Sequence, residues 1–251
     1  MTEPLAYRDF YYPLNVFMHI LTAEEGGVDY LHYGLFEKDE EPIAVAQERS
    51  TRMLLERLPA LPARLLEVGI GLGTTLHRLT KMGYEAMGIT PDEKQVAAAR
   101  ARYPETRVEC APFETFATDQ RFEVILFQES SQYIQSNALF AKTAELTDRV
   151  LVLDEFALQP VERRDALHPL QGFIEAAALH GFRKTEEIDL SNEAAPTVGY
   201  FMRRIARYKE PLVRDLGLTR EQVDELVTSG ESYQDLYRRG VYGYRLLQFA
   251  R

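Results

Sequence analysis

A carboxylate and three glycines share one short segment, Glu67-x-Gly69-x-Gly71-x-Gly73, which follows an apolar run. Glycine allows positive φ and carries no side chain, so the backbone of such a loop can lie directly against a ligand. A helix predicted from Thr74 would add unpaired N–H groups, which attract a polar or negative group. The segment therefore predicts a cradle for a nucleotide-like ligand, or else only a tight turn between a strand and a helix.

The glycine spacing separates two kinds of cofactor site. A dinucleotide-binding loop reads G-x-G-x-x-G, which would place its third glycine where this chain has Thr74. The strand predicted at 84–89 should then end in an acidic residue that binds the ribose, and Thr90 stands there instead. Both departures argue against an NAD-dependent oxidoreductase.

The segment after that strand, Gly88-Ile89-Thr90-Pro91-Asp92-Glu93-Lys94-Gln95, has residue types that favour the start of a helix. Thr90 can cap the helix, Pro91 suits its first turn, and Glu93 can complete a capping box. These residues can be explained without a ligand. A ligand contact remains open, because a cap and a ligand contact use different atoms.

The first segment resembles the E/D-x-G-x-G-x-G motif of class I S-adenosylmethionine-dependent methyltransferases, and the order of elements is similar over about residues 60–190. The second segment resembles the G-(I/V)-T-x-S-x-x-Q stretch of the cyclopropane-fatty-acid-synthase-like branch and related small-molecule methyltransferases. The resemblance implies S-adenosyl-L-methionine as the cofactor. It also implies that Glu67 and the three glycines hold this cofactor, with Thr90 in place of the usual ribose-binding acid and Gln95 as a further contact.

The resemblance implies further contacts after the third and fourth strands. The family usually has an acid for the adenine amino group where this chain has Cys110. Phe113 can stack on the purine instead, or belong to the core. Gln128 would line the methionine end of the cofactor. Glu129 and Tyr133 would face the substrate or cofactor, or form a polar loop that caps the next helix.

Two tyrosines outside this core are also candidates. Tyr33 lies in the segment 30–36, which resembles the H-x-G-Y/F-(W/F) piece of sterol- and tocopherol-type methyltransferases. In those proteins the piece folds over the cofactor, so Tyr33 is a cofactor candidate; an aromatic hinge between cap and core is the alternative. Tyr200, in the helical segment 196–240, is a candidate for the substrate pocket.

The chemistry needs alignment of the reactants and, for a hydroxyl acceptor, removal of a proton. His168 is predicted to open a helix, whose N-terminus disfavours the imidazolium, so it can act as a neutral base or be a plain helix-start residue. Asp154, directly after the strand predicted at 149–153, is the second catalytic candidate. Arg163 and Arg164 can clamp an anionic substrate or form an exposed pair. The histidines and the cysteine show no metal-ligand spacing, so no metal is expected.

Short apolar runs alternate with helical patterns through the middle of the chain, which is typical of strands buried on both faces of a parallel sheet. The expected fold is α/β, a doubly wound Rossmann-like sheet of the class I methyltransferase type, with an N-terminal helical cap and a helical lid inserted before the last strand. The expected domains are an N-terminal cap at 1–60, a cofactor-binding core at 61–192, the lid and substrate insertion at 193–240, and the final strand at 241–251. Predicted strands are 64–70, 84–89, 122–128, 149–153, 182–190 and 242–249, and the main predicted helices are 74–82, 91–103, 137–147 and 169–180.

Composition bounds the class of protein. The 251 residues carry a net charge of −10, which disfavours a nucleic-acid partner. One cysteine excludes an internal disulfide and suits a reducing compartment, and no segment is apolar enough to span a bilayer, so we expect a cytoplasmic protein without a membrane partner. A homodimer is possible.

The leading hypothesis is methyl transfer to a small molecule, at a hydroxyl of a sugar or natural product. Transfer to carbon or nitrogen of a small metabolite is the alternative. A silent cofactor-binding protein and a NAD-dependent oxidoreductase rank behind both.

Overall fold

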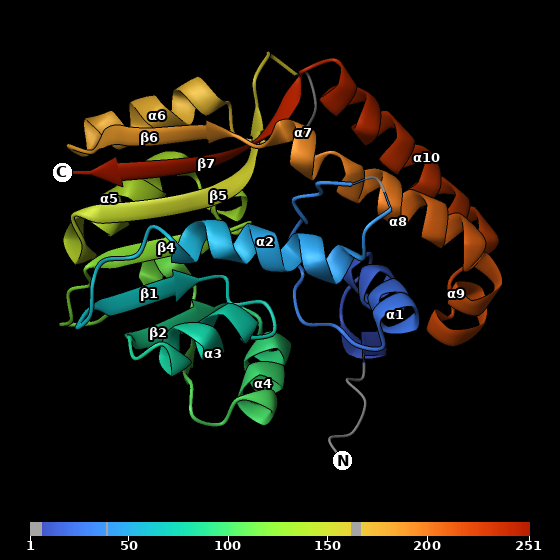
Figure 1. Cartoon of the computed structure of the whole chain (residues 1–251), viewed down its shortest axis with the longest axis horizontal. Coiled ribbons are helices and arrows are strands. Elements are labelled where there is room, and N and C mark those ends of the chain that lie inside the picture. Colours follow the sequence, from blue (N-terminus) through green and yellow to red (C-terminus); the bar gives the residue numbers. More distant parts are fainter. Residues whose placement is uncertain (1–6, 39, 162–166) are drawn as a thin grey trace. The chain divides into compact units, whose positions relative to one another are not determined.

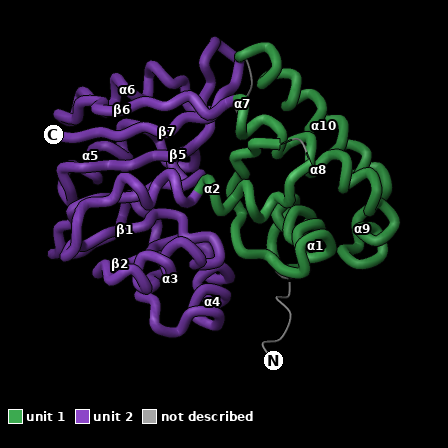
Figure 2. Tube along the Cα trace, viewed as in Figure 1, with its two compact units in different colours: residues 1–50, 192–240 green, residues 51–191, 241–251 purple. Residues whose placement is uncertain are grey.

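The computed structural model describes residues 7–38, 40–161 and 167–251. The chain divides into two compact units, shown in separate colours in Figure 2. Unit 1 contains residues 1–50 and 192–240, and unit 2 contains residues 51–191 and 241–251. The predicted clamp residues Arg163 and Arg164 lie outside the described residues.

Unit 2 is built on a seven-stranded sheet in the order β3-β2-β1-β4-β5-β7-β6 (Figure 1). Strands β1 to β5 pair in parallel, and β7 runs antiparallel to both of its neighbours. This topology confirms the predicted doubly wound α/β fold. The strand order turns around β1, which pairs with β2 on one side and β4 on the other, and ligands of such sheets bind beyond the carboxyl ends at this point. The strands are β1 Arg64–Val68, β2 Glu85–Thr90, β3 Arg107–Cys110, β4 Val124–Gln128, β5 Arg149–Ala157, β6 Arg183–Asp189 and β7 Tyr242–Ala250.

Four helices alternate with these strands in unit 2. The central strands are apolar because the sheet is buried on both faces there, and all five residues of β4 are buried. The phenylalanines Phe127, Phe140, Phe173 and Phe249 join one apolar cluster that includes residues of the sheet, α5 and α6. The helices are α3 Thr74–Lys81, α4 Glu93–Arg102, α5 Ser136–Leu146 and α6 Leu170–Leu179.

Strand β5 is longer than the sequence predicted. The apolar run ends at Leu153, but the strand continues to Ala157 because β7 pairs with it along its whole length, from Arg149 opposite Ala250 to Ala157 opposite Tyr242. Asp154 and its neighbour Glu155 are therefore buried inside a strand, and the prediction that Asp154 follows the end of the strand is corrected.

Unit 1 is helical in the described residues. It contains α1 and the first part of α2, and it continues after residue 191 with a helical series in which α8 packs against α1 and α10. The capping box predicted at the start of the longest of these helices is present, since Thr219 and Gln222 bond to each other's backbone. The elements are the 3-10 turn Tyr7–Asp9, α1 Leu14–Glu25, α2 Ile43–Leu55, α7 Ser191–Ala194, α8 Pro196–Arg207, α9 Lys209–Leu216 and α10 Arg220–Arg238.

Across the described residues, no helix combines the length and apolar character needed to cross a membrane.

Candidate functional site

The glycine loop joins β1 to α3 with a backbone that requires glycine. Gly69, Gly71 and Gly73 have φ of +80°, +52° and +82°, a region that other residues rarely adopt. A β-carbon on Gly69 would also lie 2.3 Å from the β-carbon of Ser130, in the loop after β4. The loops after β1 and β4 are therefore in direct contact. Glycine is needed at Gly69 for space as well as for conformation.

Glu67 stands just before this loop, on the buried strand β1. Its side chain is 3% exposed, and its Oε2 has no hydrogen-bond partner among the described residues. Burial raises the pKa of this carboxyl to about 8. A buried acceptor without a partner costs about 1–3 kcal/mol. This carboxyl is therefore suited to a ligand that supplies a hydrogen-bond donor or a positive charge.

The loop after β2 brings two predicted cofactor residues together. The Thr90 hydroxyl donates to Oε1 of Gln95 at 3.1 Å. The prediction that Thr90 caps the following helix is corrected, because the cap is Asp92, whose carboxylate accepts from the N–H groups of Lys94 and Gln95. The Thr90 hydroxyl is thus held at the carboxyl end of β2, where it also accepts from the N–H of Asp92 at 3.4 Å.

The segment after β3 contains Cys110 and Phe113, where the resemblance implies the contact with adenine. Cys110 is exposed at the end of β3, where its thiol lies 3.7 Å from the carbonyl oxygen of Pro91. Phe113 is only 2% exposed and packs edge-on against Phe127, with 5.3 Å between the ring centroids. A ring buried in this way has no free face for a purine. The structure therefore places Phe113 in the core, which was the alternative to stacking.

Gln128, at the end of β4, is bonded on both sides of its amide. Its Oε1 accepts from the Thr75 hydroxyl on α3, and its Nε2 donates to the Thr51 hydroxyl on α2, both at 3.2 Å. The side chain is 7% exposed. Gln128 therefore links α3 and α2 to the end of β4, and in this arrangement both ends of its amide are used for these contacts.

Glu129 is the one residue other than glycine with positive φ in the described chain, at +54°. Such a conformation costs on the order of 1–3 kcal/mol and is found mainly where function demands it. Its N–H donates to the Leu153 carbonyl at 2.9 Å, and its Oε1 accepts from the Tyr244 hydroxyl at 2.6 Å. Tyr244 itself is fully buried on β7. The half-buried Glu129 carboxylate is thus fixed at the carboxyl edge of the sheet.

Asp154 anchors the loop that follows Glu129. Its Oδ2 accepts from both the N–H and the hydroxyl of Ser131 and from the N–H of Gln132, at 2.7–3.3 Å. Burial raises the pKa of Asp154 to about 6, although these hydrogen bonds act in the opposite direction. Asp154 has no exposed surface, so its carboxylate binds the loop after Glu129 and is not accessible to a substrate.

His168 is bonded through both ring nitrogens. Its Nε2 lies 2.9 Å from the Ile134 carbonyl and 3.2 Å from that of Ser131, and its Nδ1 lies 3.2 Å from the Ser136 hydroxyl. Carbonyls only accept, so Nε2 carries the proton and Nδ1 accepts from Ser136. The lone pair that a general base needs is therefore already engaged. His168 thus stabilises the loop 131–136 through its contacts with Ser131, Ile134 and Ser136. Its catalytic role stays a prediction that these contacts do not favour.

The three predicted tyrosines are divided between the two units. Tyr133 belongs to unit 2 and is 76% exposed. Tyr33 and Tyr200 belong to unit 1. The Tyr33 carbonyl accepts from Nδ1 of His32 at 2.9 Å, and the Tyr200 hydroxyl donates to Glu25 at 3.2 Å. Their roles toward a ligand stay predictions.

The residues that the sequence did not single out are Tyr244 and the serines of the β4 loop. Ser130 donates its hydroxyl to the Val68 carbonyl, and Ser131 links Asp154 to His168. No local pattern marks them, because each acts through a partner far away in the chain. The described residues contain no group of three or more histidines, cysteines or carboxylates arranged to hold a metal ion.

Comparison with known proteins fits this geometry. The sequence profile described as a methyltransferase domain matches residues 66–151. The ubiquinone biosynthesis O-methyltransferases of Nitrobacter winogradskyi and Bradyrhizobium diazoefficiens are 27% identical over 81 residues and 24% identical over 83 residues. These matches cover 31% and 32% of this chain, and 31% and 33% of those proteins. The matched part is thus about a third of the length of these relatives.

Solved structures share the fold over most of the chain. The cyclopropane synthase MmaA2 of Mycobacterium tuberculosis has a TM-score of 0.75 at 18% identity, with 88% of this chain and 89% of that chain covered. The mycolic acid cyclopropane synthase CmaA1, solved with SAH and CTAB, has a TM-score of 0.80 at 17% identity, with 100% and 99% covered. A putative sarcosine dimethylglycine methyltransferase from Galdieria sulphuraria has a TM-score of 0.79 at 15% identity, with 94% and 96% covered. Residues 66–151 thus match a methyltransferase domain, and the sheet order and the glycine motif are similar to those of class I S-adenosylmethionine-dependent methyltransferases.

Proposed function

We propose that this protein transfers a methyl group from S-adenosyl-L-methionine to a hydroxyl of a small molecule, such as a sugar or natural product. The observation that carries the cofactor assignment is the buried Glu67 carboxyl, whose Oε2 has no partner among the described residues and which stands directly before a loop with three glycines of positive φ. The observation that supports a hydroxyl acceptor is the Glu129 carboxylate, fixed in a strained conformation at the same edge of the sheet.

The residues present fit the proposed cofactor. At its three glycine positions the loop offers only backbone, which a ligand that approaches closely requires. Glu67 offers an unsatisfied acceptor, and a cationic ligand would favour its charged form. Thr90 and Gln95 add neighbouring hydroxyl and amide groups at the end of β2. When bound, the cofactor would supply a methyl group activated by a sulfonium.

Glu129 is the residue that we propose to handle the acceptor proton. A hydroxyl loses its proton when its oxygen is methylated, and a positioned carboxylate can accept that proton. Tyr244 donates to one oxygen of Glu129 and so fixes the orientation of the carboxylate. Asp154 and His168 then act as positioning residues, because they hold the loop 131–136 that follows Glu129.

Calorimetry with S-adenosylhomocysteine and, separately, with NAD tests the cofactor assignment. We expect binding of the first and none of the second. Binding of NAD alone would exclude methyl transfer.

The acceptor is tested by incubating the enzyme with S-adenosylmethionine and candidate alcohols, and by detecting methylated products by mass spectrometry. Amines and olefins belong in the same screen, since the fold neighbours include cyclopropane synthases and a putative sarcosine dimethylglycine methyltransferase. Products formed only from amines or olefins would refute the hydroxyl acceptor while leaving the cofactor assignment intact.

A further inference from the structure

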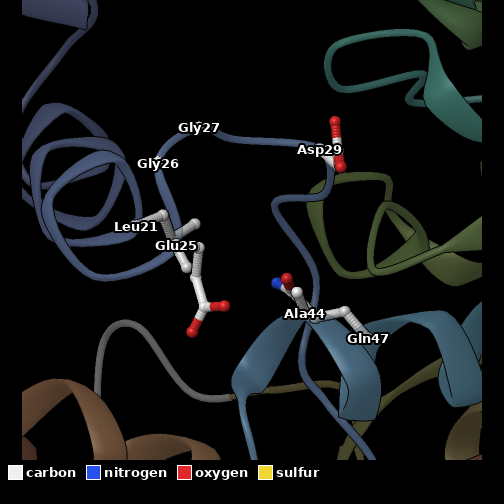
Figure 3. Close-up of a pocket in the computed structure, with 7 residues that line it drawn as sticks. All are labelled: Leu21, Glu25, Gly26, Gly27, Asp29, Ala44 and Gln47. Atoms are coloured by element: carbon white, nitrogen blue, oxygen red, sulfur yellow. The ribbon is translucent and has the colours of Figure 1, made fainter.

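Unit 1 contains a pocket of its own between the end of α1 and the first turns of α2 (Figure 3). Its volume is about 240 Å³. A water molecule in the liquid occupies about 30 Å³, so the pocket has room for a molecule of several non-hydrogen atoms. Seven residues line it: Leu21, Glu25, Gly26, Gly27, Asp29, Ala44 and Gln47.

The charge of the lining is negative. Its two ionisable residues are Glu25 and Asp29, and it includes no lysine, arginine or histidine. Glu25 is the last residue of α1, where the negative end of the helix dipole disfavours a carboxylate. Its neighbour Glu24 is compensated by ion pairs with Arg204 and Arg207. The half-buried Glu25 has no ion pair with a described residue and accepts only from the neutral Tyr200 hydroxyl.

Gln47 faces Glu25 from the opposite side of the pocket (Figure 3). Its Nε2 donates to the carbonyls of Tyr30 and His32, at 3.3 and 2.6 Å, so the two ends of its amide cannot be exchanged. The side chain is 3% exposed, and among the described residues its Oε1 has no donor. An amide oxygen of a buried residue that lines a pocket and has no donor among the described residues can accept from a ligand in that pocket.

We propose that this pocket binds a small primary alkylammonium ion. Such an ion has three N–H donors, two of which match the oxygens of Glu25 and Gln47. The positive charge offsets an uncompensated carboxylate at a helix C-terminus. Leu21 and Ala44 provide an apolar wall for a short alkyl chain. This inference concerns unit 1 alone and does not depend on the proposed methyl transfer.

Isothermal titration of the full chain with n-butylammonium chloride tests the proposal, with butan-1-ol and tetramethylammonium chloride as comparisons. We expect one site for butylammonium, no detectable binding of the alcohol, and much weaker binding of tetramethylammonium, which lacks N–H donors. Glu25→Gln should weaken butylammonium binding by about tenfold or more, since a hydrogen bond to a charged group contributes about 1.5–3 kcal/mol. Glu231→Gln, which removes an exposed carboxylate from α10, should leave binding unchanged.

Equal losses in the Glu25 and Glu231 variants would show general attraction to an acidic protein and overturn the proposal. Equal binding of butylammonium and the alcohol, or no binding of butylammonium, would overturn it too. If Glu25→Gln does not fold by circular dichroism, Ala44→Leu takes its place, because the longer side chain fills the pocket with the carboxylate intact. Full binding in folded Ala44→Leu would place the ligand elsewhere.

Discussion

The pH dependence of stability is the sharpest test of the burial of Glu67. Burial raises its pKa from the ordinary 4.5 to about 8 in the folded protein. Below the ordinary value Glu67 is protonated in both the folded and unfolded states. As the pH rises, the unfolded state ionises first and becomes relatively more favourable. The free energy of unfolding should therefore fall until the folded state also ionises, near a pH of about 8.

The size of this loss follows from the two pKa values. Each tenfold change in proton affinity corresponds to about 1.4 kcal/mol, so the full effect is on the order of 5 kcal/mol. Two other buried groups titrate at lower pH: burial raises the pKa of Asp154 to about 6 and lowers that of His32 to about 4. Between about pH 6.5 and 8 the slope thus belongs mainly to Glu67, with an expected loss of about 2 kcal/mol.

The assay compares Glu67→Gln with the unmodified protein, both without cofactor, by urea unfolding across this pH range. Far-ultraviolet circular dichroism is the probe, because the chain has no tryptophan. We expect the variant to gain stability relative to the unmodified protein by about 1.4 kcal/mol per pH unit up to about pH 8, with no further gain above it. The contributions of other groups cancel in this difference.

A flat difference between the two proteins would refute the reasoning. Glu231→Gln serves as the control, since its carboxylate is exposed and should leave the slope unchanged. A direct check is the carbon-13 titration of the carboxyl signal that disappears in Glu67→Gln. A midpoint near the ordinary 4.5 would show that Glu67 is ionised at neutral pH in the folded protein, and that burial does not raise its pKa.

Three further outcomes are expected. Gly69→Ala should lose more stability than Gly83→Ala and should also lose S-adenosylhomocysteine binding. Both positions have positive φ, but a β-carbon on Gly69 would lie 2.3 Å from the β-carbon of Ser130, whereas one on Gly83 would lie 3.4 Å from a leucine methyl. Equal losses in urea unfolding would show that only conformation matters there. Glu129→Gln should lower turnover on the identified hydroxyl acceptor by about a hundredfold and Tyr244→Phe by about tenfold, with cofactor affinity retained in calorimetry; unchanged turnover in both would remove the pair from the chemistry. Asp154→Asn should destabilise unit 2 by about 2 kcal/mol, because an amide cannot accept all the bonds from the β4 loop. Unchanged stability with lost turnover would instead favour a catalytic Asp154.

The sequence was sufficient where a structure depends on neighbours in the chain. Apolar runs placed the central strands, and the glycines after β1 predicted a loop whose positive φ values the structure shows. The capping box at Thr219 was confirmed because a box uses residues three positions apart. The β2 loop shows the limit of local rules: Thr90 and Asp92 both favour a helix start, and the structure shows that Asp92 is the cap, since its carboxylate accepts from the N–H groups of Lys94 and Gln95.

Pairings between distant segments could not be predicted in this way. Strand β5 continues past its apolar run only because β7 pairs with it, and this pairing turns Asp154 from an expected edge residue into a buried anchor. Phe113 could be a stacking platform or a core residue by sequence, and its neighbour Phe127 decides for the core. A helix-start histidine looks like a free base until its two ring nitrogens are seen to be bonded to the β4 loop.

The costs to stability in unit 2 lie where local rules fail. Glu67 is a carboxyl on a buried strand, and Glu129 adopts a backbone conformation that favours glycine. Neither improves packing: burial of Glu67 disfavours its charge, and glycine would relieve the strain at Glu129. The strain is maintained by Tyr244, from a strand that the chain reaches only 115 positions later. Both unfavourable features lie beside the point where the strand order turns around β1, which is where a doubly wound sheet binds its ligand. Stability alone would favour other residues than these two carboxylates at their positions. Their presence is best explained by the ligand that binds at this edge of the sheet.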